Sequence, residues 1–252
     1  MQNAFRLDGQ LALVTGGGTG LGFGICRAMT EAGARVVMTG RREETLRQAS
    51  GQLGSTSAYI RHDVTDFPSI PGLVEQVENR FGPVDILVNN AGNYLKKSAV
   101  DTSDADFASV LHTHLFGAYA LSRECGRRML ARRRGSILMI VSMASLLGIP
   151  LVSAYSAAKS ALLGLTRALT VEFSPHGVRV NAIAPGWFNT ALNRKAFETD
   201  PARKQKILDR TPLGTLGEEM DVGHAAVYLC SPAAKFVTGI CLPVDGGASI
   251  GF

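Results

Sequence analysis

Short apolar runs alternate with segments of helical periodicity along most of the chain. The strand-like runs cover residues 12–15, 35–39, 57–61, 86–89, 137–141, 178–183 and 241–244. Between them, apolar residues recur at the spacing of one helix face, as Leu73, Val77 and Phe81 do. Strands that alternate with helices form a parallel sheet with helices on both faces and right-handed crossovers. The pattern predicts an α/β fold built on one doubly wound parallel sheet of about seven strands.

The first strand-like run leads directly into a glycine-rich turn, in which Gly16, Gly20 and Gly22 precede a helical pattern. This order of strand, turn and helix places a dinucleotide pyrophosphate on a helix N-terminus. Glycine lets backbone N–H groups approach the phosphates closely. The spacing differs from G-x-G-x-x-G, so the glycines alone are weak evidence, and the strand and helix around them strengthen it. We expect a dinucleotide to bind here.

Tyr155 and Lys159 are four residues apart in a helical segment and therefore share one helix face. An ammonium beside a phenol favours the phenolate, so we expect Lys159 to lower the pKa of Tyr155 from its usual value near 10. Such a phenol can pass a proton to or from a carbonyl or alcohol oxygen. Ser142, thirteen residues earlier, is the candidate to hydrogen-bond the same oxygen. Taken alone, the Tyr-x-x-x-Lys pair is also compatible with an ordinary amphipathic helix turn.

Five motifs in this order resemble those of the short-chain dehydrogenase/reductase family. They are residues 15–22, residues 89–92, the trio Ser142, Tyr155 and Lys159, residues 181–186, and residues 244–247. The match covers nearly the whole chain and implies a single Rossmann-type domain over residues 1–252. It also implies NAD(P)-dependent interconversion of a ketone and a secondary alcohol. In that reaction Tyr155 would be the acid/base, Ser142 would orient the substrate oxygen, and Lys159 would act on Tyr155 and hold the nicotinamide ribose.

The resemblance also implies which residues contact the cofactor. Asp63 and Val64 would contact the adenine, residues 89–92 would border the ribose and nicotinamide, and Thr190 would bond the carboxamide. The set implied by the resemblance is Gly16, Thr19, Gly20, Leu21, Gly22, Asp63, Val64, Asn89, Ala91, Gly92, Tyr155, Lys159, Pro185, Gly186, Phe188 and Thr190.

The residues after the second strand-like run bear on the choice between NAD and NADP. Gly40 stands where NAD-selective members of the family carry an acid that holds the 2′-hydroxyl, and Arg41 and Arg42 follow it. Arginine in place of that acid suits a 2′-phosphate, so we expect NADP(H) to be preferred over NAD(H). The alternative is that both arginines merely begin the next helix and pair with Glu43 and Glu44.

One position departs from the family pattern. The family usually has Asn in an Asn-Leu-x-Gly context, where this chain reads His114-Leu-Phe-Gly117. In relatives, that Asn anchors a water chain that leads the proton from the Lys to solvent. Imidazole also binds water and relays protons, with a pH dependence near its own pKa, so His114 is a candidate relay. The alternative is a His packed in the helix with a backbone partner.

At 252 residues, of which 46% are hydrophobic, the chain is long enough to bury one large core. The first eight residues lack the apolar stretch of a signal peptide, and no apolar run is long enough to span a membrane. We therefore expect a cytoplasmic protein that does not associate with membranes. Cys26, Cys125, Cys230 and Cys241 are scattered, which favours free buried thiols over disulfides or a metal site.

The net charge of +5 is unevenly placed, because Arg127, Arg128, Arg132, Arg133 and Arg134 cluster at the expected end of a helix. Cations suit a helix C-terminus. We favour this interpretation over a docking patch for an acidic partner such as an acyl carrier protein. No aromatic interleaving or groove-reading motif supports nucleic acid binding.

The expected substrate pocket is largely apolar, which favours a ketone or secondary alcohol with aliphatic or aromatic flanks. Its candidate residues are Tyr94, Ser142, Leu147, Ile149, Trp187 and Leu192. Nearby cations such as Lys96 and Arg194 suit a carboxylate or a phosphate. The charged segment 187–215 predicts a substrate lid with a short helix.

Three other functions fit the sequence. One is a 3-oxoacyl-thioester reductase that acts on acyl carrier protein, and one is a sugar or sugar-acid dehydrogenase. The third, outside enzymes, is a cofactor-sensing regulator, and the complete catalytic trio argues against it. The resemblance also implies a homo-oligomer, a tetramer or a dimer. The small residues Ala157, Ala161, Gly164 and Ala168 would permit close helix packing between subunits, or equally packing on the sheet.

Overall fold

A computed structural model describes residues 4–251; the side chains of residues 191, 192, 195 and 196 lie outside this description, and with them the expected substrate contact of Leu192. In the described residues, seven strands form one parallel sheet in the order β3-β2-β1-β4-β5-β6-β7. The strands are β1 (Leu11–Thr15), β2 (Arg35–Gly40), β3 (Ser57–Arg61), β4 (Ile86–Asn89), β5 (Gly135–Ile140), β6 (Val178–Pro185) and β7 (Cys241–Val244). The expected doubly wound parallel sheet is confirmed.

The inner strands are apolar on both faces because helices cover both faces of the sheet. Every residue of β1 and of β4 is buried. β6 continues two residues beyond its expected end at Ile183, because Ala184 and Pro185 pair with Pro243 and Val244 of β7. This extension carries the chain to the edge of the sheet where the other strands also end.

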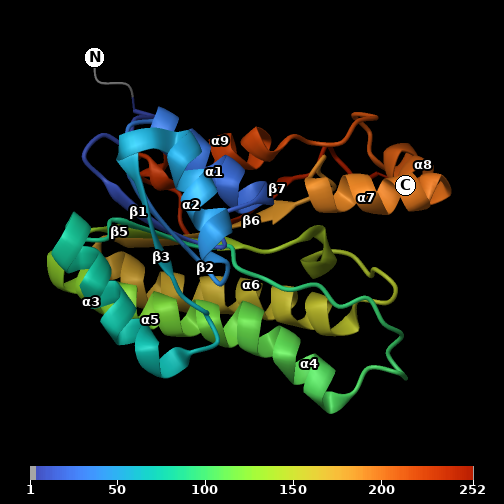
Figure 1. Cartoon of the computed structure of the whole chain (residues 1–252), viewed down its shortest axis with the longest axis horizontal. Helices are drawn as coiled ribbons and strands as arrows, with labels where there is room; N and C mark the ends of the chain where they lie inside the picture. Colours follow the sequence, from blue (N-terminus) through green and yellow to red (C-terminus); the bar gives the residue numbers. More distant parts are fainter. Residues whose placement is uncertain (1–3, 252) are drawn as a thin grey trace.

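Figure 1 shows the helices in two layers. One layer holds α1 (Gly20–Glu31), α2 (Glu43–Leu53) and α9 (Glu219–Cys230), and the other holds α3 (Ile70–Phe81), α4 (Asp104–Leu111), α5 (Gly117–Arg132) and α6 (Ser153–Phe173). Each face of the sheet has its own cluster of buried apolar side chains. The sheet therefore lies at the centre of a three-layer molecule.

The segment expected to be a lid contains two helices, α7 (Ala191–Thr199) and α8 (Pro201–Arg210), rather than one short helix. The break falls at Asp200, whose carboxylate accepts a hydrogen bond from the Arg203 N–H at 2.9 Å. Pro201 occupies the first position of α8, where its missing N–H costs nothing. The role of this segment as a lid stays a prediction.

All four cysteines are free thiols. Cys26, Cys125 and Cys230 are buried, as expected, whereas Cys241 is half-buried on β7. Among the helices of the described residues, none combines the length and apolar character needed to cross a membrane.

Candidate active site

The expected site residues gather along one edge of the sheet, where the parallel strands end. β1 leads into the glycine turn, β4 into residues 90–92, β5 into Ser142, and β6 into residues 186–190. β1 pairs with β2 on one side and with β4 on the other, so the strand order reverses between β1 and β4. Ligands of doubly wound sheets bind at this reversal.

The glycine turn is packed so closely that side chains would not fit. A Cβ on Gly22 would lie 2.2 Å from the carbonyl oxygen of Gly16, and Gly16 itself has a φ of +65°. α1 begins at Gly20, and the side chain of Thr19, its N-cap, makes no hydrogen bond to the first turn. The first N–H groups of α1 are therefore available to an anion, and the turn fits a dinucleotide pyrophosphate.

Thr15 and Asn90, which belong to the first two motifs, hold the glycine turn in place. The Asn90 side-chain nitrogen donates to the carbonyl oxygens of Thr15 at 2.9 Å and Gly16 at 3.2 Å. The Thr15 hydroxyl accepts hydrogen bonds from the N–H groups of Asn90 and Ala91, both at 3.0 Å. The sequence could have indicated this contact, because Thr15 ends the first strand and Asn90 follows the fourth, and these two strands are adjacent in a doubly wound sheet.

Arg41 and Arg42 follow β2 with exposed side chains, and neither takes part in an ion pair in the part of the chain that the structure describes. Glu44 pairs with Arg47 at 2.8 Å. Arg42 is the N-cap of α2, as the alternative expected, but no ion pair joins Glu43 or Glu44 to Arg41 or Arg42 among the described residues. The two guanidinium groups remain available to a ligand at this corner of the site.

Asp63, expected at the adenine, lies close enough to Arg41 for their charges to interact. Burial would raise the pKa of the Asp63 carboxyl, but two hydrogen bonds from Thr65 and the charge of Arg41 lower it overall. Val64 is buried, with 7% of its surface exposed, and belongs to the core between the sheet and α5. Its side chain therefore serves packing.

The segment after β6 returns to the glycine turn. The Thr190 hydroxyl caps α7 by accepting a hydrogen bond from the Asn193 N–H at 3.3 Å, and the Thr190 methyl group lies next to Gly20. Gly186 packs against the residue that follows β7, because a Cβ on it would lie 2.7 Å from the Cα of Asp245. The two C-terminal motifs thus meet beside the turn.

Ser142, Tyr155 and Lys159 come together where β5 ends and α6 begins. The Ser142 hydroxyl accepts a hydrogen bond from the Ala144 N–H at 3.1 Å. Tyr155 lies in the first turn of α6 and Lys159 one turn later. The Lys159 Nζ lies 5.6 Å from the centroid of the Tyr155 ring and donates to the Ile140 carbonyl oxygen at 2.6 Å.

Burial governs the proton affinities of Tyr155 and Lys159. It raises the pKa of the Tyr155 phenol, and a hydrogen bond with Ser142 offsets this only in part. Burial also lowers the pKa of Lys159 to about 7. The expectation that Lys159 lowers the pKa of Tyr155 is wrong for this arrangement. The ammonium is bonded to Ile140, and the cost of burying a phenolate dominates.

His114 is buried in a π-helical segment, His112–Phe116, that joins α4 to α5. Its Nε2 lies 2.7 Å from the carbonyl oxygen of Asn93. Burial, and then the charge of Lys159, lowers the pKa of His114 to about 3. The ring is therefore neutral at physiological pH, and the expected pH dependence near the usual imidazole pKa is wrong. The backbone partner required by the alternative interpretation is present.

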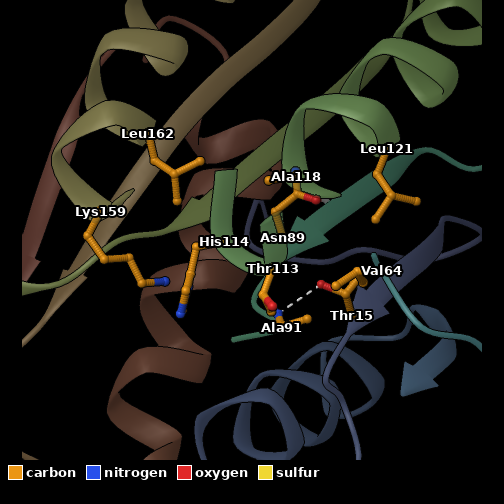
Figure 2. Close-up of a pocket in the computed structure, with 10 residues that line it drawn as sticks. All are labelled: Thr15, Val64, Asn89, Ala91, Thr113, His114, Ala118, Leu121, Lys159 and Leu162. Carbon is orange, nitrogen blue, oxygen red and sulfur yellow. Dashed lines mark hydrogen bonds between the residues drawn. The ribbon is translucent and has the colours of Figure 1, made fainter. Parts of the chain in front are cut away.

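Figure 2 shows a small cavity beside Lys159 and His114. Its volume is about 10 Å³, and about 10–15 Å³ holds one water. Asn89 lines it, with its side-chain nitrogen bonded to the Ser122 hydroxyl at 2.9 Å and its side-chain oxygen without a partner. The Asn89 amide thus contacts α5 rather than the glycine turn, which leaves only its backbone to border a cofactor.

Four of the apolar residues expected near the substrate are exposed or half-buried, namely Tyr94, Leu147, Ile149 and Trp187. The Tyr94 ring stands edge-on to Tyr155, with centroids 5.7 Å apart. Phe188 is only 3% exposed and packs against Gly217. The side chain of Phe188 therefore fills the core, and only its backbone could contact a cofactor.

Comparisons with known proteins agree with this geometry. A family model described as enoyl-(acyl carrier protein) reductase matches residues 16–249. Galactitol 2-dehydrogenase (L-tagatose-forming) of Cereibacter sphaeroides is 41% identical over 252 residues, which cover 99% of this chain and 98% of the relative. The 2-dehydro-3-deoxy-D-gluconate 5-dehydrogenase of Bacillus subtilis (strain 168) is 40% identical, and the alignment covers 98% of this chain and 97% of the relative.

Similarity in structure is equally extensive. A crystal structure of a gluconate 5-dehydrogenase from Burkholderia cenocepacia J2315, in complex with NADP and tartrate, superposes with a TM-score of 0.93 at 34% identity. The superposition covers 99% of this chain and 98% of the other. Matches of this extent confirm the family that the five motifs indicated. The chain is an oxidoreductase of the short-chain dehydrogenase/reductase family.

Proposed function

We propose that the chain is an NADP(H)-dependent enzyme that interconverts a ketone and a secondary alcohol in a sugar or sugar acid. The observation that carries the proposal is the meeting of a hydroxyl, a phenol and an ammonium, from Ser142, Tyr155 and Lys159. They lie at the same edge of the sheet as a glycine turn that fits a dinucleotide. This combination provides proton transfer next to a hydride carrier.

Tyr155 transfers the proton. Because burial raises its pKa, the phenol is protonated at neutral pH and can donate to a carbonyl oxygen, as reduction requires. The Ser142 hydroxyl holds the same oxygen by a hydrogen bond. A nicotinamide, when bound, supplies or accepts the hydride. Lys159, whose pKa is about 7, can return a proton to Tyr155 near neutral pH.

His114 assists Lys159 as a hydrogen-bond acceptor rather than by titrating. Nε2 lies 2.7 Å from the carbonyl oxygen of Asn93 and 3.2 Å from the Asn93 N–H. The shorter contact needs a proton on Nε2, so we take Nδ1 as the acceptor. Nδ1 is buried without a partner, as is the side-chain oxygen of Asn89. The cavity between them and Lys159 has room for about one water. We assign this cavity as the first step of the path between Lys159 and solvent, along which a proton arrives during reduction and leaves during oxidation.

The preference for NADP(H) over NAD(H) rests on Arg41 and Arg42. Their charges are not neutralised by ion pairs in the described residues. Gly40 provides no carboxylate for a 2′-hydroxyl, and a Cβ there would meet nothing closer than 3.5 Å. A doubly charged 2′-phosphate suits two free guanidinium groups.

A substrate with several hydroxyl groups is favoured by the relatives that the chain most resembles among those named above. The two curated relatives are named for galactitol and for a deoxygluconate.

The arginine cluster argues against docking of an acyl carrier protein. Arg128 and Arg132 contact Glu78 at 3.4 and 3.1 Å, which ties α5 to α3. The cluster lies where α5 ends and β5 begins, at the edge of the sheet opposite to Ser142. A carrier bound there would not deliver its thioester to Tyr155. Reduction of a 3-oxoacyl thioester is therefore the weaker candidate.

We also propose that the chain forms a homo-oligomer through α6. Ala157, Gly164 and Ala168 are exposed and Ala161 is half-buried, so the alternative in which these residues pack on the sheet is wrong for the first three. Small exposed residues at helical spacing let two helices approach closely. Light scattering during gel filtration measures the mass, and a monomer at micromolar concentration would contradict this proposal.

The four free thiols suit a reducing compartment, and we propose that the protein is cytoplasmic. Fractionation of the native host tests this, because recovery outside the cytoplasm would contradict it.

The function is tested by oxidation of NADPH and NADH with keto sugars, keto sugar acids and 3-oxoacyl thioesters. We expect turnover with NADPH and a keto sugar or keto sugar acid. The Tyr155→Phe variant should bind NADPH and lose activity by about 100-fold or more, whereas Tyr59→Phe, on β3, serves as the matched control. A preference for thioesters would overturn the substrate class. Tight NADPH binding with no turnover of any carbonyl would favour the cofactor-sensing regulator.

A further inference from the structure

Leu151 has a left-handed backbone, with a φ of +66°. A bulky L-residue in this region is strained. Among the described residues, the other non-glycine position with positive φ is Arg133, at +53°. Arg133 is the C-cap of α5, where a left-handed residue is a common helix ending. Leu151 instead lies in the turn that leads into α6, so capping does not explain its conformation.

A hydrogen bond holds Leu151 in this conformation. The N–H of Lys97 donates to the Leu151 carbonyl oxygen at 2.8 Å. Lys97 belongs to the segment after β4 that also carries Tyr94, whose ring stands edge-on to Tyr155. Leu151 therefore lies where the loop after β4 meets the turn that leads to Tyr155, four residues along the chain.

The Leu151 side chain is 45% exposed although it is apolar. Tyr94 is 53% exposed and Leu146 is 42% exposed, and both lie on the same two loops. We call these three side chains the apolar rim. Exposed apolar side chains on the loops that carry the reacting groups are candidates for ligand contact. Backbone strain in a bulky residue persists where the surroundings impose it, and it concentrates at functional sites.

We infer that Leu151 binds substrate and sets specificity, by packing its side chain on the carbon chain beyond the reacting carbonyl. The left-handed backbone fixes the direction in which the Leu151 side chain leaves the turn before α6. Glycine or asparagine would adopt this conformation with less strain, but neither offers the apolar contact. The inference rests on the proposed carbonyl reduction at Tyr155 and adds a residue that selects among its substrates.

The test uses Leu151→Gly and Leu151→Asn, which keep the backbone conformation and remove the apolar contact. With a ketone that the wild type reduces, KM for the ketone should rise about 3- to 30-fold in both variants, because an apolar side-chain contact is lost. We expect kcat and KM for NADPH to stay near the wild-type values, and the melting temperature should not fall, because both residues relieve backbone strain. Leu151→Asn also guards against a folding defect peculiar to the glycine variant.

Arg133→Gly is the matched control, because it changes the other left-handed residue at a place remote from Ser142 and Tyr155. It should leave both KM values unchanged. An unchanged KM for the ketone in both Leu151 variants, with an active wild type, would overturn the inference and leave the proposed function intact. A wild type that reduces no carbonyl would contradict the proposed function itself, and with it the role of Leu151 in binding substrate.

Discussion

The imidazole of His114 stands edge-on to the phenol of Tyr155, with ring centroids 5.2 Å apart and ring planes at 87°. His114 is itself fixed by the Asn93 carbonyl, and the Tyr94 ring makes a second edge contact with Tyr155. The π-helical segment between α4 and α5 thus contributes directly to the position of the proposed acid. The residue that departs from the family pattern is built into the site.

The acceptor role of His114 predicts different outcomes for two substitutions. His114→Phe keeps an aromatic ring against Tyr155 but removes the acceptor, and we expect kcat to fall about 10- to 100-fold. His114→Asn retains a polar side chain and should keep most of the activity. Because the pKa of His114 is about 3, the wild-type kcat should show no titration of this group between about pH 5 and pH 9. Equal kcat values for His114→Phe and the wild type would contradict the relay.

Gly92 is required by the packing of His114. A Cβ on Gly92 would lie 2.3 Å from Cε1 of the imidazole. Gly92→Ala should therefore displace the ring, lower the free energy of unfolding by about 1–3 kcal/mol and reduce kcat. Urea denaturation with parallel kinetics measures both effects.

Gly72→Ala is the control for this substitution, because nothing lies within 4 Å of a Cβ at that position on α3. It should raise the free energy of unfolding by roughly 0.5–1 kcal/mol. Adding His114→Asn to Gly92→Ala should recover part of the lost stability. A Gly92→Ala variant as stable as the wild type would show that the ring is not confined there.

The buried Lys159 makes the stability depend on pH. Its pKa is lowered from 10.5 to about 7, so between these values the unfolded chain binds a proton that the folded chain has released. The contribution of Lys159 to the free energy of unfolding therefore rises with pH above about 7. Below about pH 7, Lys159 is charged in both the folded and the unfolded chain, and the folded state bears the full cost of burying that charge. Relative to Lys159→Met, the wild type should gain up to about 1.4 kcal/mol per pH unit between about pH 7 and pH 9. Parallel curves for the two proteins in urea denaturation would contradict the lowered pKa.

The free charge on Arg41 predicts a change in cofactor preference. Arg41→Ala should raise KM for NADPH about 10- to 100-fold, because a charged hydrogen bond to phosphate is lost, and should leave KM for NADH nearly unchanged. Arg47→Ala is the control, since Arg47 is already paired with Glu44. An equal effect of Arg41→Ala on both cofactors would mean that the guanidinium does not recognise the 2′-phosphate.

The fold could be predicted from the sequence because strands such as β1 are apolar throughout, and the motif residues stand at strand ends. The pKa shift of Tyr155 could not be predicted, because its burial depends on Tyr94 and His114, which come from other segments of the chain. The contact between the Asn89 amide and Ser122 likewise depends on how α5 packs on the sheet.

The backbone of Leu151 carries no local signal either, since leucine is an unusual residue for a left-handed turn. Its conformation is tied to a hydrogen bond from Lys97, which is distant in sequence. Contacts of this kind, between loops that follow different strands, are set by the tertiary fold rather than by local propensity.

We propose that Tyr155 transfers a proton during NADPH-dependent reduction of a ketone. The most direct test is the single-turnover rate of NADPH oxidation with a keto sugar acid by the wild type and by Tyr155→Phe, with NADPH affinity measured for both. We expect equal NADPH affinity and a rate at least about 100-fold lower in the variant. A Tyr155→Phe variant that reduces the ketone at the wild-type rate would contradict it.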